Sequence, residues 1–198
     1  MIAWPAIVAT WAAQLLFFGP LDTSAPVGYH IGPASDVRLA EWALRAWERA
    51  IGGPLRLQRA PEQDALLRIR WVGAGGGKYG EMRPIRVGDK RGAEVYVYRS
   101  MDALGPEIAA ETRRDPLFRD AIVYLTCLHE TGHGLGLEHT ADYADIMYFF
   151  GHGGDIPEYF RRYRRNLQGV NDIPKHSGLS ITDVNRVRRL YPRSVKSP

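Results

Sequence analysis

The eleven residues from His129 to His139 constrain this chain more than any other stretch. They read H-E-T-G-H-G-L-G-L-E-H. On a helix, His129 and His133 stand four positions apart and project from one face, so two imidazole nitrogens can meet one metal ion. Gly134 and Gly136 are poor residues for a helix interior, and a glycine just past the last helical residue permits a left-handed turn. Such a turn would return His139 to the same ion.

Glu130 lies next to this predicted ligand set. It is turned about a third of the way round the helix, so its carboxylate would reach the edge of the metal site. There it could take a proton from a metal-bound water instead of binding the metal. Three neutral imidazoles leave a fourth, open position, and an open position on zinc is typical of a catalytic site.

Two further segments complete a resemblance to a known family. The pattern H-E-x-x-H-x-x-G-x-x-H, followed by Asp145-Ile146-Met147-Tyr148, resembles the metzincin zinc endopeptidases with their Met-turn. H-G-L-G-L-x-H-T followed by I-M-Y is most similar to the matrixins within that clan. The pattern L-S-x-x-D-x-N-x-x-x-x-L-Y, which begins at Leu179, is similar to the closing helix of the matrixin catalytic domain. The resemblance spans roughly Val27 to Pro192.

The resemblance implies a zinc-dependent endopeptidase that hydrolyses peptide bonds of proteins or peptides. One catalytic zinc ion would be held by His129, His133 and His139. Glu130 would act as general base toward a metal-activated water, and Met147 would pack beneath the ligands without touching the metal.

In the family, an antiparallel edge strand pairs with the substrate backbone, which makes Tyr79, Glu81 and Met82 candidate substrate-binding residues. The segment 150–176, after the Met-turn, would form one wall of the pocket for the residue that follows the scissile bond.

The sequence departs from the vertebrate matrixins at other positions. Those enzymes carry histidines for a structural zinc on two strands, where this chain has Glu81 and Glu94, so a structural zinc is not predicted. Asp89 stands nearly alone as an acidic candidate for calcium, and a calcium site is left open. Phe149 replaces the tyrosine that serves some metzincins as an extra zinc ligand. His152 and His176 are expected to be exposed loop residues.

Hydrophobic periodicity predicts the fold class. Alternation indicates strands at 27–31, 55–57, 67–71, 79–83 and 93–98. Helical spacing indicates three main helices: one from a cap at Ser35 or Asp36 to Ile51, one from Asp115-Pro116 through the histidines, and one opened by Ser180. In this last helix Ile181, Val184, Val187, Leu190 and Tyr191 are predicted to face inward. We expect an α+β (α/β-like) domain with a twisted, mixed, mostly parallel sheet, one antiparallel edge strand and a metzincin-type zinc site.

The amino terminus reads as a separate segment. Residues 2–18 carry no charge, and small residues follow up to Ala25. We therefore expect residues 1–25 to be a signal peptide, with an uncleaved membrane anchor or a buried amino-terminal element as alternatives. Residues 26–198 would form one catalytic domain. This implies a secreted or extracytoplasmic protein, membrane-anchored if the segment is kept.

Charge and cysteine content limit the kinds of binding partner and covalent link that this chain can have. A net charge of +4 without clustered basic and aromatic residues argues against nucleic acid. Cys127 is the single cysteine, so no intramolecular disulfide can form, and a buried thiol is expected. The basic run 161–165 indicates either a preference for acidic substrates or surfaces, or a solvated helix face.

Two other functions remain open at the level of sequence. One is a zinc-binding interaction module that has lost catalysis, and the other is a membrane-tethered assembly protein. Substrate identity and oligomeric state leave no mark that can be read in the sequence.

Overall fold

The computed structural model describes residues 19–73 and 78–193 of the chain. Residues 1–18 of the predicted secretory segment lie outside the described part of the chain. Residues 74–77, which belong to a glycine-rich run at 73–77, lie outside it as well. Within the described part, no helix is both long and apolar enough to cross a membrane.

Among the described residues, five strands form one sheet. They are β1 (Val27–Ile31), β2 (Leu57–Arg59), β3 (Leu67–Val72), β4 (Gly80–Val87) and β5 (Lys90–Tyr98). Four of them largely overlap the predicted strands, whereas the other lies at 57–59 instead of the predicted 55–57. Their order across the sheet is β2-β1-β3-β5-β4, and every neighbouring pair is parallel except β4 with β5. The predicted fold class, a mostly parallel sheet with one antiparallel edge strand, is therefore confirmed.

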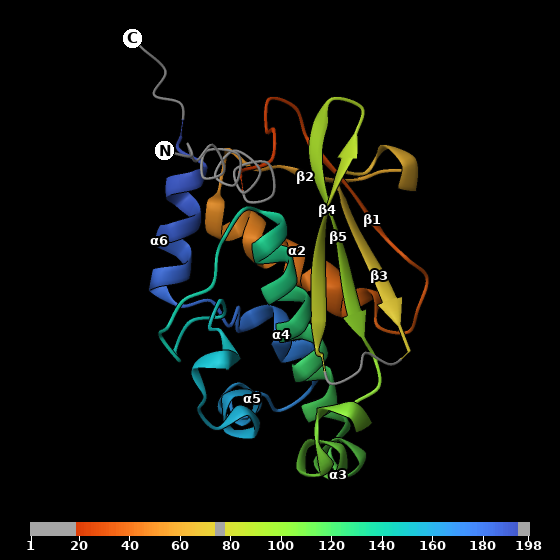
Figure 1. Cartoon of the computed structure of the whole chain (residues 1–198), viewed down its shortest axis with the longest axis vertical. Helices are drawn as coiled ribbons and strands as arrows, with labels where there is room; N and C mark the ends of the chain where they lie inside the picture. Colours follow the sequence, from red (N-terminus) through yellow and green to blue (C-terminus); the bar gives the residue numbers. More distant parts are fainter. Residues whose placement is uncertain (1–18, 74–77, 194–198) are drawn as a thin grey trace, which may run out of the picture.

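The helices gather on one face of this sheet (Figure 1). They are α2 (Val37–Ile51), α3 (Pro106–Arg114), α4 (Pro116–Gly134), α5 (Ile156–Arg164) and α6 (Ile181–Leu190). The three predicted main helices are α2, α4 and α6. The short helices α3 and α5 are additional to these three, and each buries only three residues.

Helix α4 is the central element of the fold. Its first turn is capped as predicted, since the Asp115 carboxylate accepts the backbone N–H of Phe118 at 3.1 Å. Helix α2 covers one side of α4, and the indole N–H of Trp47 donates to the Leu128 carbonyl at 2.8 Å. The carboxyl-terminal end of α4 is thus a buried, rigid segment.

Two local predictions are wrong. Asp36 does not cap α2 with its side chain, because its carboxylate is bound by Arg119 at 2.5 Å and by Arg99 at 2.9 Å. Ile181 does not face inward, and 73% of its surface is exposed. It is the first residue of α6, and the buried face of that helix runs instead through Asp183 and Val187.

Strands β4 and β5 are longer than predicted. They form a hairpin whose last pair is Val87 with Lys90. Gly88 in the connecting turn has φ of +62°, a conformation that glycine adopts without strain. Because of this turn, both strands continue through Arg86, Lys90 and Arg91, the charged residues that interrupt the apolar alternation in the sequence.

Candidate metal centre and adjoining cavity

Three histidines meet at the end of α4. The helix ends at Gly134, and Gly136, with φ of +101°, turns the chain back as the sequence predicted. One ring nitrogen from each of His129, His133 and His139 lies within 4.8 Å of the other two. In residues 19–73 and 78–193 this is the only such group of three or more potential ligands. The predicted metal-ligand set is therefore brought together.

Backbone carbonyls set the tautomers of two of these rings. The Nδ1 atom of His129 lies 2.7 Å from the Ile146 carbonyl, and that of His133 lies 2.8 Å from the Leu137 carbonyl. A carbonyl only accepts, so each Nδ1 carries the proton and each Nε2 keeps its lone pair. Burial lowers the pKa of His129 to about 3 and that of His133 to about 4, so both rings are neutral at pH 7. The sequence could not identify these two carbonyls.

The donor set fits zinc. Two Nε2 atoms bound to one tetrahedral zinc ion at about 2.0–2.1 Å would lie about 3.3 Å apart. The Nε2 atoms of His133 and His139 are 3.1 Å apart. Neutral imidazoles whose nitrogens gather within 4.8 Å, with one pair already at this spacing, are ligands that zinc accepts readily.

Met147 packs against Gly132, in the part of α4 that carries His129 and His133. It is fully buried, and its Sδ is 2.5 Å from the position that a Cβ on Gly132 would occupy. Only glycine at 132 leaves room for this packing. The Met147 carbonyl accepts the backbone N–H of Thr140 at 2.8 Å, which ties the Met-turn to the residue after His139.

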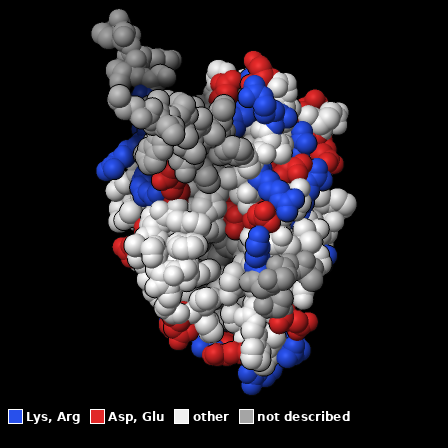
Figure 2. All heavy atoms as spheres, viewed as in Figure 1, with Lys and Arg blue, Asp and Glu red and all other residues white. Residues whose placement is uncertain are grey.

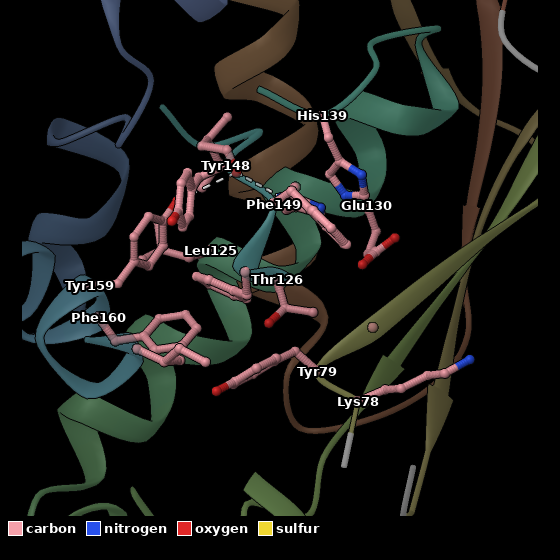
Figure 3. A pocket seen from close by; sticks show the side chains of 15 residues that line it. Lys78, Tyr79, Leu125, Thr126, Glu130, His139, Tyr148, Phe149, Tyr159 and Phe160 are labelled. Carbon is pink, nitrogen blue, oxygen red and sulfur yellow. Dashed lines mark hydrogen bonds between the residues drawn. The ribbon is translucent and has the colours of Figure 1, made fainter. Parts of the chain in front are cut away.

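Glu130 is buried beside this cluster, with 7% of its surface exposed, and in Figure 3 its carboxylate points toward β4. A Cβ on Gly80 would lie 2.6 Å from the Glu130 Cγ, so β4 approaches α4 closely at this point. Burial, reinforced by the nearby Glu81 carboxylate, raises the pKa of Glu130 to about 8. The carboxylate therefore has a high affinity for a proton.

A cavity of about 400 Å³ adjoins the cluster. It lies between α4, β4 and α5, and its wall includes the aromatic rings of Tyr79, Tyr148, Phe149, Phe150, Tyr159 and Phe160. The surface on the α5 side of this hollow is largely uncharged in Figure 2, whereas charged residues gather over the strands. Such a cavity suits a large apolar side chain.

Only one of the three predicted substrate-binding residues lines the cavity. Tyr79 lines the cavity. Glu81 does not line it, and its carboxylate pairs with Arg83 at 3.1 Å and Lys78 at 3.5 Å. Met82 does not line it either and packs against the core. Their role toward a substrate stays a prediction.

The edge of β4 presents backbone groups beside the cavity. The Tyr79 carbonyl accepts the N–H of Tyr98 at 3.0 Å, and the register continues without a bulge. Because alternate residues of an antiparallel strand face its partner, the N–H and carbonyl groups of Gly80 and Met82 point away from β5. Pro84 falls at the same kind of position, where its missing N–H removes no bond to β5.

Other residues weighed from the sequence are engaged elsewhere. The Glu94 carboxylate binds Arg70 at 2.7 Å, which uses it in an ion pair. The Phe149 ring lies 4.8 Å from that of His139 and is 45% exposed. His152 is exposed, as expected. Cys127 is fully buried, also as expected, and burial raises the pKa of its thiol.

No protein-family model and no curated protein matches the chain. A comparison with solved structures finds a likeness to high choriolytic enzyme 1, a hatching enzyme zinc-protease from Oryzias latipes (medaka fish). The likeness covers 96% of this chain and 98% of that one, with 17% sequence identity and a TM-score of 0.46. What this site can do chemically follows from its own residues.

Proposed function

We propose that this protein is a zinc-dependent endopeptidase of the metzincin type, with matrixins as the most similar family. The observation that carries the proposal is the convergence of three neutral imidazoles beside the buried carboxylate of Glu130. A purely structural zinc site has no use for a base next to an open position.

His129, His133 and His139 would hold the ion. Zinc bound there would polarise a peptide carbonyl and lower the pKa of water in its open position. Glu130 would take a proton from the attacking water and pass it to the leaving amine. Its buried setting favours the first of these transfers, because desolvation strengthens its affinity for a proton.

The substrate would be an extended peptide. Its backbone would pair with the N–H and carbonyl groups of Gly80 and with the Met82 carbonyl at the edge of β4, because the Met82 N–H bonds the Glu130 carboxylate. One large apolar side chain would enter the cavity lined by Tyr79, Phe150 and Phe160. This arrangement would hold the scissile bond near Glu130. We also propose that the chain is exported, through residues 1–25.

The test compares the zinc-loaded full chain with its Glu130→Ala variant on a diverse peptide mixture read by mass spectrometry. We expect internal cuts from the unmodified protein, with large apolar residues enriched on one side of the bond. Glu130→Ala should keep one zinc per chain and lose at least about a hundredfold in turnover, the lower range for a general base. Glu138→Ala, at an exposed position beside His139, is the matched control and should cut normally.

The competing function is a zinc-binding module without catalysis. It would be favoured if zinc is bound and neither protein cuts any peptide. Chains that bind no zinc would contradict both functions.

A further inference from the structure

The basic run 161–165 contains one arginine that differs from the other three. Most of its charge is neutralised within the fold, because three of its arginines form four ion pairs: Arg161 with Glu107 and Glu111, Arg164 with Asp115, and Arg165 with Glu158. Arg162 forms no ion pair in the part of the chain that the structure describes. The run is thus neither a uniformly solvated face nor a general acidic-substrate patch.

The contacts of Arg162 are polar or aromatic, and none carries a full negative charge. Its Nη2 donates to the Ala144 carbonyl at 3.3 Å. Its guanidinium lies 4.3 Å from the centre of the Tyr159 ring and 4.9 Å from that of Tyr143. The two rings hold the guanidinium in position and leave its charge available.

Arg162 lines a second cavity, of about 390 Å³, between α5, the Met-turn and the start of α6. Leu125, Ile146 and Leu179 give it an apolar wall, and Asn166 and Ser180 add polar groups beside Arg162. The buried acids Asp145 and Asp183 do not line it. Arg162 is therefore the one charged side chain among the described residues that line this cavity.

This cavity lies directly behind the one proposed for the substrate side chain. Leu125, Ile146 and Tyr159 line both cavities, so these three side chains form a common wall. In Figure 3, Leu125 and Tyr159 stand on the α4 and α5 sides of the first cavity. A molecule in the second cavity would press on this wall.

We propose that the second cavity binds a small organic carboxylate with an apolar body, for which Arg162 supplies the counter-charge. The guanidinium matches a carboxylate in geometry as well as charge, and the apolar wall accepts the rest of the molecule. The site does not depend on peptide hydrolysis.

The test uses phenylacetate as the probe and calorimetry on the zinc-loaded full chain. We expect saturable binding of phenylacetate and none of 2-phenylethanol, which has a similar body but no charge. Arg162→Gln should weaken binding by about tenfold or more, the loss typical of a hydrogen bond to a charged group. Arg162→Lys should retain part of it, and Arg189→Gln, at an exposed position on α6, should leave it unchanged.

Three results would overturn the proposal. Equal binding to Arg162→Gln and the unmodified protein would mean that the carboxylate sits elsewhere, on the zinc ion for instance. Equal binding of phenylethanol and phenylacetate would remove the role of charge. No binding at millimolar phenylacetate would remove the site. The phenylethanol comparison needs no variant, so the test stands even if Arg162→Gln fails to fold, and none of its readouts requires peptidase activity.

Discussion

The ionisable groups at the metal centre are held in their neutral forms by burial. His129 and His133 have lowered pKa values and Glu130 a raised one, with burial as the largest cause in each case. Neutral histidines are ready to bind a cation. Glu130 can act as a base only after it has lost its proton, which a cation bound beside it would favour. The same burial makes Glu130 a source of instability whenever it ionises without a metal ion beside it.

This instability predicts a pH effect in the metal-free protein. The pKa of Glu130 is about 8 in the folded chain, above its usual value of 4.5. The folded state therefore favours the protonated form of Glu130. The contribution of this protonated carboxyl to the free energy of unfolding is complete below pH 4.5 and is lost as pH rises through 8. Glu130→Gln should stabilise the metal-free protein by about 4 kcal/mol at pH 8, and the gain should vanish toward pH 4.5. Urea unfolding across this pH range measures it.

Glu138→Gln provides the control, because Glu138 is exposed. It should change the free energy of unfolding by less than about 0.5 kcal/mol at either pH. If Glu130→Gln gives the same difference at pH 5 and pH 8, burial does not raise the pKa of this carboxyl.

At the scale of elements, α6 supports the metal centre without touching it. The Asp183 carboxylate accepts the backbone N–H groups of Ile146 at 2.8 Å and of Ser180 at 2.9 Å. Ile146 in turn orients His129 through its carbonyl. One carboxylate thus caps the last helix and fixes the Met-turn.

Asp183→Ala should therefore weaken both the fold and the metal site. It leaves the buried Ile146 N–H without its acceptor and removes a helix cap, which together cost about 2–3 kcal/mol. Zinc affinity should fall by about tenfold or more, the range seen when groups that orient metal ligands are removed. Chemical unfolding and competition with a zinc chelator measure the two effects.

Asn185→Ala serves as the comparison, since Asn185 is exposed on the same helix. It should alter neither quantity. A normal zinc affinity in a folded Asp183→Ala protein would show that the Met-turn keeps its geometry without α6.

In the molecule as a whole, the three candidate ligands lie on two different segments of the chain. His129 and His133 belong to α4, whereas His139 lies in the loop that leads to the Met-turn and α6. An ion that binds all three would hold this loop against the central helix. Such binding stabilises the folded state because the unfolded chain has no formed site.

Zinc removal should therefore lower the melting temperature. At free zinc about a hundredfold above Kd, binding contributes about 2.7 kcal/mol, which for a chain of this size corresponds to about 5–10 °C. Thermal unfolding with added zinc and with a chelator measures the shift. In the His139→Ala variant, added zinc should raise the melting temperature only slightly. A full shift in that variant would mean that zinc binds elsewhere.

The sequence by itself determined the parts of this protein that depend on local spacing. The i, i+4 histidines, Gly136 after the helix, the Asp115 and Ser180 caps and the alternation in the strands all act within a few residues of one another. Periodicity and backbone conformation are sufficient to predict them. The ligand set, the fold class and the main helices were accessible for this reason.

Only the tertiary structure decided what depends on contacts between distant segments. Asp36 would cap its own helix if Arg99 and Arg119 did not reach it, and Ile181 faces solvent because packing selects another side of α6. The Ile146 carbonyl behind His129 and the cavity that exposes Arg162 also arise where separate segments meet. No local sequence pattern encodes these contacts, because the free energy that selects them comes from burying side chains and pairing charges between segments that are far apart in the sequence.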